Sequence, residues 1–204
     1  MSTDSPEFWD QTWAEIGAVG SGSDDILAEH VGHLIPGRAL EIGCGLGGNA
    51  VWLAKQGWRV TALDYSEIAI ENGKQLAAEQ GVCVDWVVAD ASEYQPLGSF
   101  DLIISFFIQL FPARRAVMLA NVSKVLTPGG TLLFVSHDKS GSLSGWSEED
   151  LTSLTSPEEI VRDLPDLQIE LAMVLDHDGG EHQPLEAEES HGSRTTVVRA
   201  IQPI

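Results

Sequence analysis

The sequence predicts one α/β domain in which helices cover both faces of a doubly wound, seven-stranded, mostly parallel sheet. Short apolar runs alternate along the chain with amphipathic stretches of helical period, which is typical of strands joined by right-handed crossovers. The last two extended stretches have no helix between them, so they should pair as an antiparallel hairpin at the sheet edge. The chain has 204 residues, which is enough for one full core and short for two domains.

The elements of the first half follow from capping and breaking residues. They are a helix over residues 6–16, a helix over 25–34, a strand over 38–43, a helix over 47–56 and a strand over 59–64. Ser23 or Asp24 caps the second helix, and Pro36-Gly37 ends it. Gly57 ends the third helix. Both strands are short apolar runs, as expected for strands that are buried on both faces of a sheet.

The second half carries the same kinds of signal. Its elements are a helix over residues 66–80, strands over 84–89 and 100–107, a helix over 113–126, a strand over 131–136, a short helix from 156, and strands over 167–176 and 194–201. Gly81 stops the first of these helices, and Pro128-Gly129-Gly130 is predicted to form the turn before the fifth strand. Ser156 is the expected N-cap of the last helix, with Pro157 at its first position. An acidic loop over 177–193 joins the last two strands.

Composition and charge exclude some classes of function. The formal net charge is −20, and a surface so acidic repels a phosphate backbone, so we expect no nucleic-acid partner. No apolar run approaches the roughly 20 residues that span a bilayer, and the first residues lack the pattern of a secretory signal. Cys44 and Cys83 do not suggest a disulfide framework. We therefore expect a cytoplasmic protein with no membrane association, and the sequence leaves its oligomeric state open.

Three closely spaced glycines follow the first predicted strand. Gly43, Gly45 and Gly47 allow a tight turn and a close backbone approach to a ligand at the start of the next helix. Gly43, Gly45 and Gly48 also match the dinucleotide pattern G-x-G-x-x-G. Asp64 ends the second strand, 64 − 43 = 21 residues beyond the first glycine, where a carboxylate can bind ribose hydroxyls. These residues predict a nucleotide-cofactor loop, and both NAD and an adenosine-sulfonium cofactor remain open.

Five motifs add to this loop and occur in a fixed order. They are Leu40-Glu41-Ile42-Gly43-Cys44-Gly45-Leu46-Gly47, Val60-Thr61-Ala62-Leu63-Asp64-Tyr65-Ser66, Ala89-Asp90-Ala91, Phe100-Asp101-Leu102-Ile103 and Leu126-Thr127-Pro128-Gly129-Gly130. With them, the chain resembles the class I S-adenosylmethionine-dependent methyltransferases, and most of all the small bacterial type grouped with tellurite-resistance and thiopurine methyltransferases. The resemblance runs from about Phe8 to the end. It implies a Rossmann-like fold, S-adenosylmethionine as the cofactor, and methyl transfer to a small molecule.

The resemblance also implies roles for residues at the carboxyl ends of the strands, where open α/β sheets bind ligands. Glu41 would offer a carboxylate near the positively charged methionine end, and Asp64 would bind the ribose hydroxyls. Asp90 would accept a hydrogen bond from the adenine amino group. Ser105 and Phe106 would face the methionine portion. The full set of expected cofactor-binding residues is Glu41, Gly43, Cys44, Gly45, Gly47, Asn49, Asp64, Tyr65, Ser66, Asp90, Ala91, Ser105 and Phe106.

This interpretation divides the single domain, residues 1–204, into three regions. Residues 1–36 form an N-terminal helical lid region, 37–138 the cofactor-binding core, and 139–204 a C-terminal helix and strand hairpin. Trp9 and Trp13 lie four residues apart, on one face of the first helix. They either pack on the domain or close over the cofactor as a lid, and the two interpretations are compatible.

The acceptor side is less defined by the sequence. His137 and Asp138 follow the fifth strand and are the candidates for a catalytic base. The residues expected to line the acceptor are 8–20, 106–111 and 137–146, with the loop over 177–193 as a further candidate. A thiol or chalcogen acceptor would need no dedicated base, whereas a hydroxyl would. No metal is expected, because the spacing of His177, His182 and His191 fits no compact ligand set.

Two competing classes of function stay open at this point. One is a nicotinamide-dependent oxidoreductase, which the glycine loop and Asp64 allow but the terminal hairpin and Asp90-Ala91 oppose. The other is a non-catalytic module that binds the cofactor without turning over an acceptor.

Overall fold

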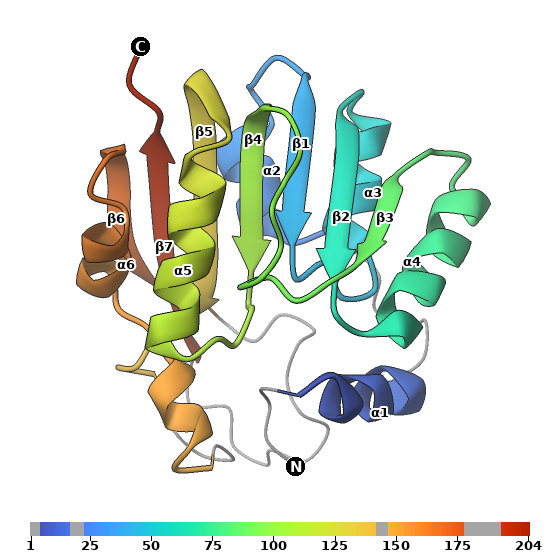
Figure 1. Ribbon diagram of the computed structural model, residues 1–204, viewed down its shortest axis with the longest axis horizontal. Coiled ribbons are helices and arrows are strands. Elements are labelled where there is room, and N and C mark those ends of the chain that lie inside the picture. Colours follow the sequence, from blue (N-terminus) through green and yellow to red (C-terminus); the bar gives the residue numbers. More distant parts are fainter. Residues whose placement is uncertain (1–4, 17–22, 142–146, 178–192) are drawn as a thin grey trace.

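The computed structural model describes residues 5–16, 23–141, 147–177 and 193–204 (Figure 1). Its centre is a seven-stranded sheet of order β3-β2-β1-β4-β5-β7-β6. The strands are β1 Arg38–Ile42, β2 Arg59–Asp64, β3 Asp85–Val88, β4 Phe100–Phe106, β5 Leu126–His137, β6 Gln168–His177 and β7 Ser193–Ile201. The helices are α1 Pro6–Ile16, α2 Asp25–Val31, α3 Gly48–Lys55, α4 Glu67–Glu79, α5 Pro112–Ser123, the 3₁₀ turn η1 Asp150–Ser153 and α6 Pro157–Asp163.

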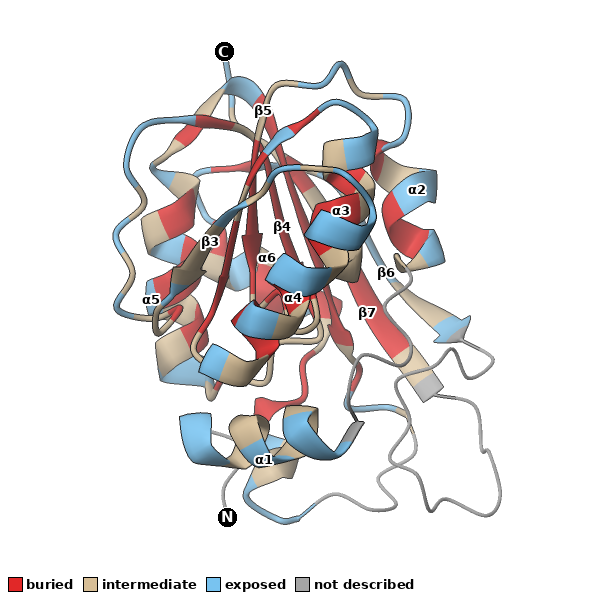
Figure 2. Cartoon of the chain, turned by 90° about the vertical axis from the view of Figure 1, so that its right-hand side faces the viewer, coloured by how far each residue is buried: buried red, intermediate tan, exposed pale blue. Residues whose placement is uncertain are grey.

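Strands β1 to β5 are parallel, and β7 is antiparallel to both β5 and β6. The predicted fold class, with its C-terminal hairpin, is therefore confirmed. Helices α2, α3 and α4 pack on one face of the sheet, and α5 and α6 pack on the other (Figure 2). The strand order reverses between β1 and β4, which lie side by side in the sheet. In open α/β sheets, this switch point marks the ligand-binding edge.

Two hydrophobic clusters, one on each face, hold the helices against the sheet. Phe100, Ile103 and Phe134 are fully buried between the sheet and helices α5 and α6. Leu102 and Ile104 belong to the opposite cluster, with α2, α3 and α4. Because β4 is covered on both faces, its centre, Leu102-Ile103-Ile104, is apolar at consecutive positions and does not alternate.

Helix α1 lies outside this sandwich. Figure 1 shows it beyond the carboxyl ends of the parallel strands, beside the start of α4, which it contacts. Its position puts α1 at the same edge of the sheet as the glycine loop, whereas α2, which also belongs to the predicted lid region, packs on a face of the sheet.

The predicted strand over 131–136 is too short at its start, because β5 already begins at Leu126. The Pro128-Gly129-Gly130 segment is not a separate turn, because it is held as an irregular part of the strand. Gly129 N–H donates to Gln202 O at 2.8 Å, and Gln202 N–H donates to Gly130 O at 2.9 Å. Helix α5 ends at Ser123, three residues before the predicted end. These pairing partners are far apart in the sequence, so local turn signals did not reveal them.

The predicted start of the last helix is confirmed by its cap. The Ser156 side chain and Glu159 form a capping box, with Pro157 in the first turn of α6.

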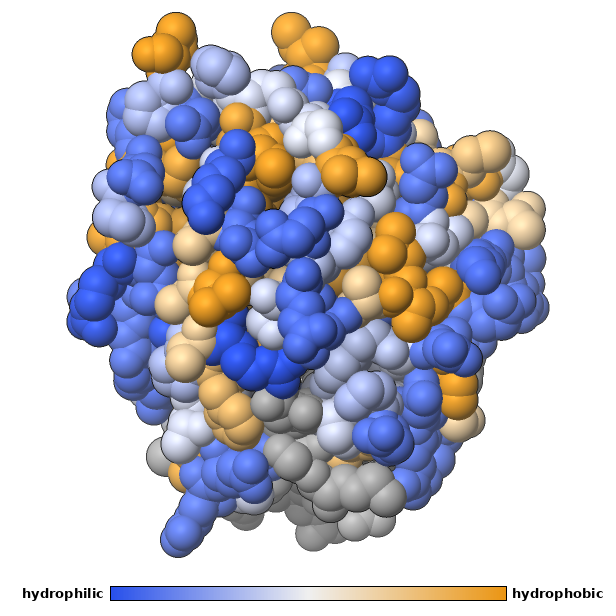
Figure 3. Space-filling model, viewed as in Figure 1, coloured by the Kyte–Doolittle hydropathy of each residue, from blue (hydrophilic) through white to orange (hydrophobic). Residues whose placement is uncertain are grey.

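On the face seen in Figure 3, apolar side chains occur as separate patches among polar ones, so its described part offers no continuous apolar surface. Within the described ranges, no helix is both long and apolar enough to cross a membrane.

Candidate functional site at the carboxyl edge of the sheet

The loop between β1 and α3 is shaped by three glycines with positive φ. Gly43, Gly45 and Gly47 have φ of 70°, 49° and 81°, values that residues with a Cβ rarely adopt. The N–H groups of Gly43 and Cys44 both donate to Leu63 O at 2.9 Å. The loop is thereby fixed to the end of β2. Because its first two N–H groups are hydrogen-bonded within the protein, they are not free to bind a phosphate. The loop is better suited to letting a ligand come close to its backbone.

Asp64 is buried at the end of β2, with 7% of its surface exposed. Its Oδ2 accepts a hydrogen bond from Gly45 N–H at 2.9 Å, and its Oδ1 accepts one from Ser66 N–H at 3.0 Å. Burial raises the pKa of Asp64 above its ordinary value, although these hydrogen bonds oppose the shift. Each carboxylate oxygen has a second lone pair, so Asp64 can hold the loop and also accept hydrogen bonds from a ligand.

Glu41 lies one strand away and is 1% exposed. Hydrogen bonds from the Asn49 side chain and the Ala50 backbone reach its carboxyl group, but its Oε2 has no partner. Burial, with the negative charge of Asp64 adding to it, raises the pKa of Glu41 to about 8. Ser105, whose Cα pairs with Ile42 on the neighbouring strand, also has a buried Oγ without a partner. Unpartnered buried oxygens on adjacent strand ends are unusual in a native protein and fit a polar ligand at this edge.

Asp90 lies after β3, on the other side of Asp64. Its Oδ1 accepts hydrogen bonds from Ser92 N–H at 2.8 Å and from the Ser92 hydroxyl at 2.7 Å, and its Oδ2 forms an ion pair with Arg114. Burial favours a higher pKa for Asp90, but these hydrogen bonds and the Arg114 charge outweigh it and lower the pKa. Arg114 and Ser92 were not predicted as site residues. Arg114 follows Pro112 in the first turn of α5, and its sequence position gave no sign that it reaches Asp90.

Helix α1 is tied to the loop by contacts at two places. Asp10 accepts hydrogen bonds from the Ser66 hydroxyl and from Ile68 N–H at the start of α4, where a helix N-terminus favours a negative charge. The Trp13 ring lies so near Gly45 that a Cβ there would be 3.2 Å from its Cζ2. Trp9 stacks on Trp13 with ring centroids 5.5 Å apart. The structure thus brings Trp13 to the glycine loop and Trp9 against Trp13.

The segment after β4 contains a backbone outlier that the sequence did not indicate. Phe107 has φ of 54°, which is rare for a residue with a Cβ and costs on the order of 1 kcal/mol. Its N–H donates to Val135 O at 2.8 Å, and its ring lies 4.8 Å from the His137 ring. Two residues later, Gln109 has a buried Oε1 without a partner. Strained residues of this kind cluster at binding sites, so this segment is the best candidate for the acceptor side.

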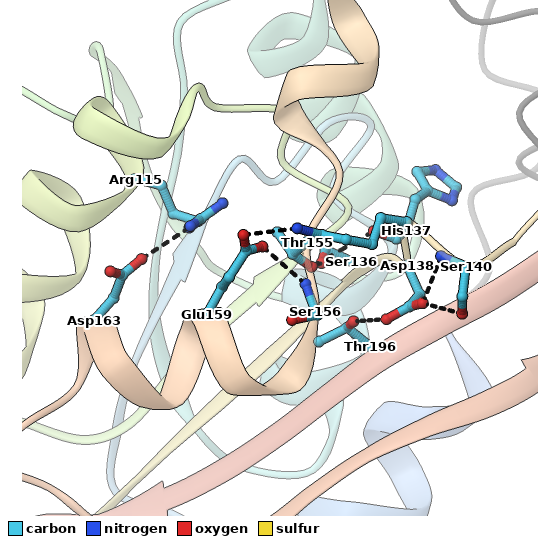
Figure 4. A network of polar contacts seen from close by, with 11 residues as sticks. Arg115, Ser136, His137, Asp138, Ser140, Thr155, Ser156, Glu159, Asp163 and Thr196 are labelled. Atoms are coloured by element: carbon cyan, nitrogen blue, oxygen red, sulfur yellow. Dashed lines mark hydrogen bonds and ion pairs between the residues drawn. The ribbon is translucent and has the colours of Figure 1, made fainter.

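Asp138, by contrast, is held in place by hydrogen bonds from neighbouring side chains and backbone. Figure 4 shows its carboxylate between Ser140 and Thr196, while the His137 ring points away from it. Asp138 Oδ1 accepts hydrogen bonds from the N–H and hydroxyl groups of Ser140, and Oδ2 accepts one from the Thr196 hydroxyl at 2.6 Å. Burial alone would raise the pKa of Asp138, but these hydrogen bonds lower it. The geometry therefore favours a role in fixing the end of β5 to β7, and the two catalytic candidates do not act on each other.

This role gives a testable expectation. Asp138→Asn should lower the free energy of unfolding by about 1.5–3 kcal/mol, because it weakens hydrogen bonds to a charged acceptor. Urea unfolding measures the change. The control is Asp176→Asn, because Asp176 pairs with Arg194 at an exposed site with 84% of its side chain accessible; such pairs contribute about 0–1 kcal/mol. An Asp138→Asn protein of unchanged stability that has lost its activity would show that Asp138 is catalytic.

Comparison with known proteins identifies the cofactor class. Residues 39–130 match the family model described as a methyltransferase domain. The chain is 32% identical over 153 residues to a probable thiol methyltransferase of Arabidopsis thaliana, covering 69% of this chain and 67% of that protein. The chain belongs to the class I S-adenosylmethionine-dependent methyltransferases. This decides between the two cofactors that the glycine loop and Asp64 left open.

One more sequence relative and one solved structure are similar to this methyltransferase. It is 28% identical over 142 residues to a ubiquinone biosynthesis O-methyltransferase of Escherichia coli O9:H4 (strain HS), covering 68% of this chain but 56% of that protein. It therefore spans little more than half of that relative. The crystal structure of TehB from Haemophilus influenzae has the same fold, with a TM-score of 0.76 at 16% identity over 95% of this chain and 67% of that one. The fold and the enzyme class expected from the sequence are confirmed.

Cys44 and the histidines considered as metal ligands remain to be placed. Cys44 is buried, and burial raises the pKa of its thiol well above the ordinary value, which fits a packing residue and not a nucleophile. Among the described residues, no three His, Cys, Asp or Glu side chains gather as a metal-binding group. His182 and His191, and most of the loop predicted over 177–193, lie outside the described residues.

Burial of Glu41 predicts how the stability of the methyltransferase depends on pH. The folded pKa of about 8 lies above the ordinary value of 4.5, so the native state holds more protons than the unfolded state between these values. Stability should then fall as the pH rises through this window, by about 1.4 kcal/mol per pH unit from this group. Glu41→Gln should gain stability relative to wild type, increasingly from pH 5.5 to 8 in urea titrations. Glu79→Gln, which removes an exposed carboxylate of α4, is the control, and an equal gain there would contradict the assignment to Glu41.

Proposed function

We propose that this enzyme transfers the methyl group of S-adenosylmethionine to a small molecule with a thiol, chalcogen or hydroxyl nucleophile. One observation carries the proposal. At the switch point of the sheet, two buried carboxyl groups, Glu41 and Asp64, lie at the glycine loop, and the charged groups that act on them among the described residues are carboxylates. Such an edge suits a positively charged adenosine cofactor. The similarity to a thiol and an O-methyltransferase supports a small acceptor, and the net charge of −20 argues against nucleic acid.

In this proposal, different residues contact the ribose, the adenine and the methionine end of the cofactor. Asp64 binds the ribose hydroxyls, with Tyr65 and Ser66 beside the adenosine. Asp90, held by Ser92 and Arg114, accepts a hydrogen bond from the adenine amino group, and the Ala91 backbone contacts the ring edge. Glu41 and the Ser105 hydroxyl face the methionine end together with Phe106, because Glu41 Oε2 and Ser105 Oγ are buried without a hydrogen-bond partner among the described residues. Gly43, Gly45, Gly47, Cys44 and Asn49 form the backbone and packing of the loop.

The bound cofactor supplies an electrophilic methyl group on a sulfonium sulfur. The protein holds the acceptor in line with it and excludes water, and positioning of this kind provides much of the rate. Phe107 and Gln109 after β4 and His137 at the end of β5 line the acceptor in this proposal. A thiol needs no base from the protein, whereas His137 would accept the proton of a hydroxyl acceptor.

Helix α1 acts as the lid of this site. Trp13→Ala should weaken the binding of S-adenosylhomocysteine by about tenfold, because the indole against Gly45 no longer holds α1 over the loop. Isothermal titration calorimetry measures the affinity, and the exposed Glu7→Ala on the same helix is the control. If Trp13→Ala lowers the unfolding midpoint but leaves the affinity unchanged, α1 only packs on the domain.

Ligand-dependent thermal unfolding tests the proposed cofactor. A ligand at about 100 times its Kd stabilises a protein by roughly 2.7 kcal/mol, which is a midpoint shift of about 5–10 °C for a domain of this size. We expect the shift with S-adenosylmethionine and S-adenosylhomocysteine, and a shift with NAD(H) alone would overturn the proposal. Acceptors are then compared by mass spectrometry for the gain of one methyl group, using thiols, selenols and phenols. Cofactor binding with no methylated product from any of them would favour a non-catalytic module.

The two cysteines bear on the proposed cellular compartment. Cys44 and Cys83 are both free, which suits the reducing cytoplasm expected from the sequence.

A further inference from the structure

We propose that Glu41 senses the charge of the cofactor: it is protonated in the free enzyme, loses its proton when cationic S-adenosylmethionine binds, and regains it when the cofactor becomes neutral. This makes Glu41 a specificity-determining residue that favours the methyl donor over the demethylated product. The inference rests on the proposed cofactor site, and it adds a coupling between proton binding and cofactor binding.

The position of Glu41 provides the geometric basis. It lies in β1, the strand between β2 and β4, and is 1% exposed. The Asn49 side chain and the Ala50 N–H at the start of α3 reach its carboxyl group, and Asn49 Oδ1 in turn accepts a hydrogen bond from Asp24 N–H at 2.9 Å. Its Oε2 has no partner. A buried carboxylate with an unsatisfied oxygen is costly, so the group stays neutral unless a cation approaches.

Among the described residues, the charged group that shifts the pKa of Glu41 is a carboxylate. Asp64 from β2 is its charged neighbour, and Asp10 from α1 adds negative charge next to Asp64. The Cys44 thiol from the loop also faces both carboxyl groups. Arg114, at the start of α5, is paired with Asp90. The combined effect is a pKa of about 8 for Glu41, so at neutral pH the free enzyme holds the proton.

The two cofactor forms differ in net charge. In both, an ammonium and a carboxylate offset each other, so the product is neutral overall, and only the methyl donor, with its sulfonium, brings a net positive charge to the site. Methyl transfer breaks the sulfur–methyl bond and leaves the electron pair on sulfur, so the cation disappears. The acceptor loses its own proton to solvent, and Glu41 takes up another from solvent. The buried site therefore never holds two uncompensated carboxylates.

Proton counting tests this inference directly. The purified enzyme is titrated with S-adenosylmethionine and, separately, with S-adenosylhomocysteine in weakly buffered solution at pH 7 with an indicator dye. A group with a pKa of about 8 is roughly nine-tenths protonated at pH 7, so we expect about 0.9 proton released per methyl donor bound and close to none per product. The ammonium of the ligand also titrates near this pH, and the sulfonium lowers its pKa in the donor relative to the product. The proton uptake by each ammonium, known from titration of the free ligand, is therefore subtracted before the two ligands are compared.

Affinities over a pH series provide the second measurement. The ratio of donor affinity to product affinity should rise up to tenfold per pH unit from pH 6 to about 8 and then level off. In Glu41→Gln, which mimics the protonated form, the difference in proton release should vanish and the ratio should stay flat. Glu79→Gln is the matched control and should behave as wild type.

The outcomes are distinguishable. Equal proton release with both ligands, or release that persists in Glu41→Gln, would overturn the role of Glu41 while leaving cofactor binding intact. Failure of both ligands to bind would overturn the proposed cofactor site itself. If Glu41→Gln does not fold, the wild-type comparison of the two ligands still decides, because it needs no variant.

Discussion

Asp64→Ala is expected to abolish measurable binding of S-adenosylmethionine and S-adenosylhomocysteine while the protein remains folded. The carboxylate has two tasks at once. It accepts hydrogen bonds from Gly45 N–H and Ser66 N–H, which fix the loop and the start of α4, and in the proposed site it also accepts from the two ribose hydroxyls. Hydrogen bonds to a charged group contribute about 1.5–3 kcal/mol each, so losing the two ribose contacts should raise Kd by roughly 100-fold or more.

Calorimetric titration at 25 °C measures this loss, and two variants separate its causes. Asp64→Asn keeps the size and one acceptor oxygen, so it should show an intermediate affinity. Asp85→Ala removes an exposed carboxylate from the neighbouring strand β3, in register with Thr61 of β2, and should bind normally. An Asp64→Ala protein that binds S-adenosylhomocysteine within threefold of wild type would show that Asp64 only shapes the loop.

The parts of this site that could be predicted are those fixed by chain order. In a βα repeat, each residue that ends a parallel strand comes to one edge of the sheet, whatever lies between the strands. Asp64 ends a strand, Glu41 and Ser105 are each the last but one residue of a strand, and Asp90 follows one. All four therefore lie at the carboxyl edge of the sheet, as the chain order indicates, and Glu41 and Asp64 are near enough for the charge of one to raise the pKa of the other. The spacing of the glycines was similarly informative, because a positive φ at Gly43 and Gly45 is a local property.

The parts that could not be predicted depend on contacts between distant residues. Arg114 meets Asp90 across 24 positions, and Thr196 meets Asp138 across 58. No local pattern indicates such pairs, so Asp138 was assigned as a candidate base from its position alone. The positive φ of Phe107 was missed for a similar reason, because aromatic residues seldom adopt it and β5 must supply the carbonyl that holds it.

Gly47→Ala is the second change with a large expected effect, and here the loss is in stability. Gly47 has φ of 81°, and a Cβ there would lie 2.5 Å from Cη2 of Trp86 and 3.2 Å from the Cα of Gly73. The left-handed conformation costs a residue with a Cβ about 1–2 kcal/mol, and overpacking adds about 1–3 kcal/mol. We expect the free energy of unfolding in urea to fall by about 2–5 kcal/mol.

A matched control isolates the steric part of this effect. Gly129 has a similar φ of 78° but nothing within 4 Å of the Cβ position, so Gly129→Ala should cost only the conformational part. Trp86→Leu in the Gly47→Ala background should recover most of the difference, as a double-mutant cycle would show. Equal losses at the two glycines, with no recovery, would contradict the contact.

The glycines of the loop are required for two different reasons, which the neighbours of each Cβ position indicate. A Cβ on Gly73 would also clash with Trp86, at 2.6 Å, so the indole of β3 fits between the start of α3 and the middle of α4 only because both helices have a glycine at the contact. Gly47 is thus required by the packing of the protein itself. Gly43 and Gly45 instead face Ile108 and Trp13, side chains of the acceptor segment and of the lid helix. Alanine at either of these two positions should therefore reduce cofactor affinity more than Gly47→Ala does, per kcal/mol of stability lost.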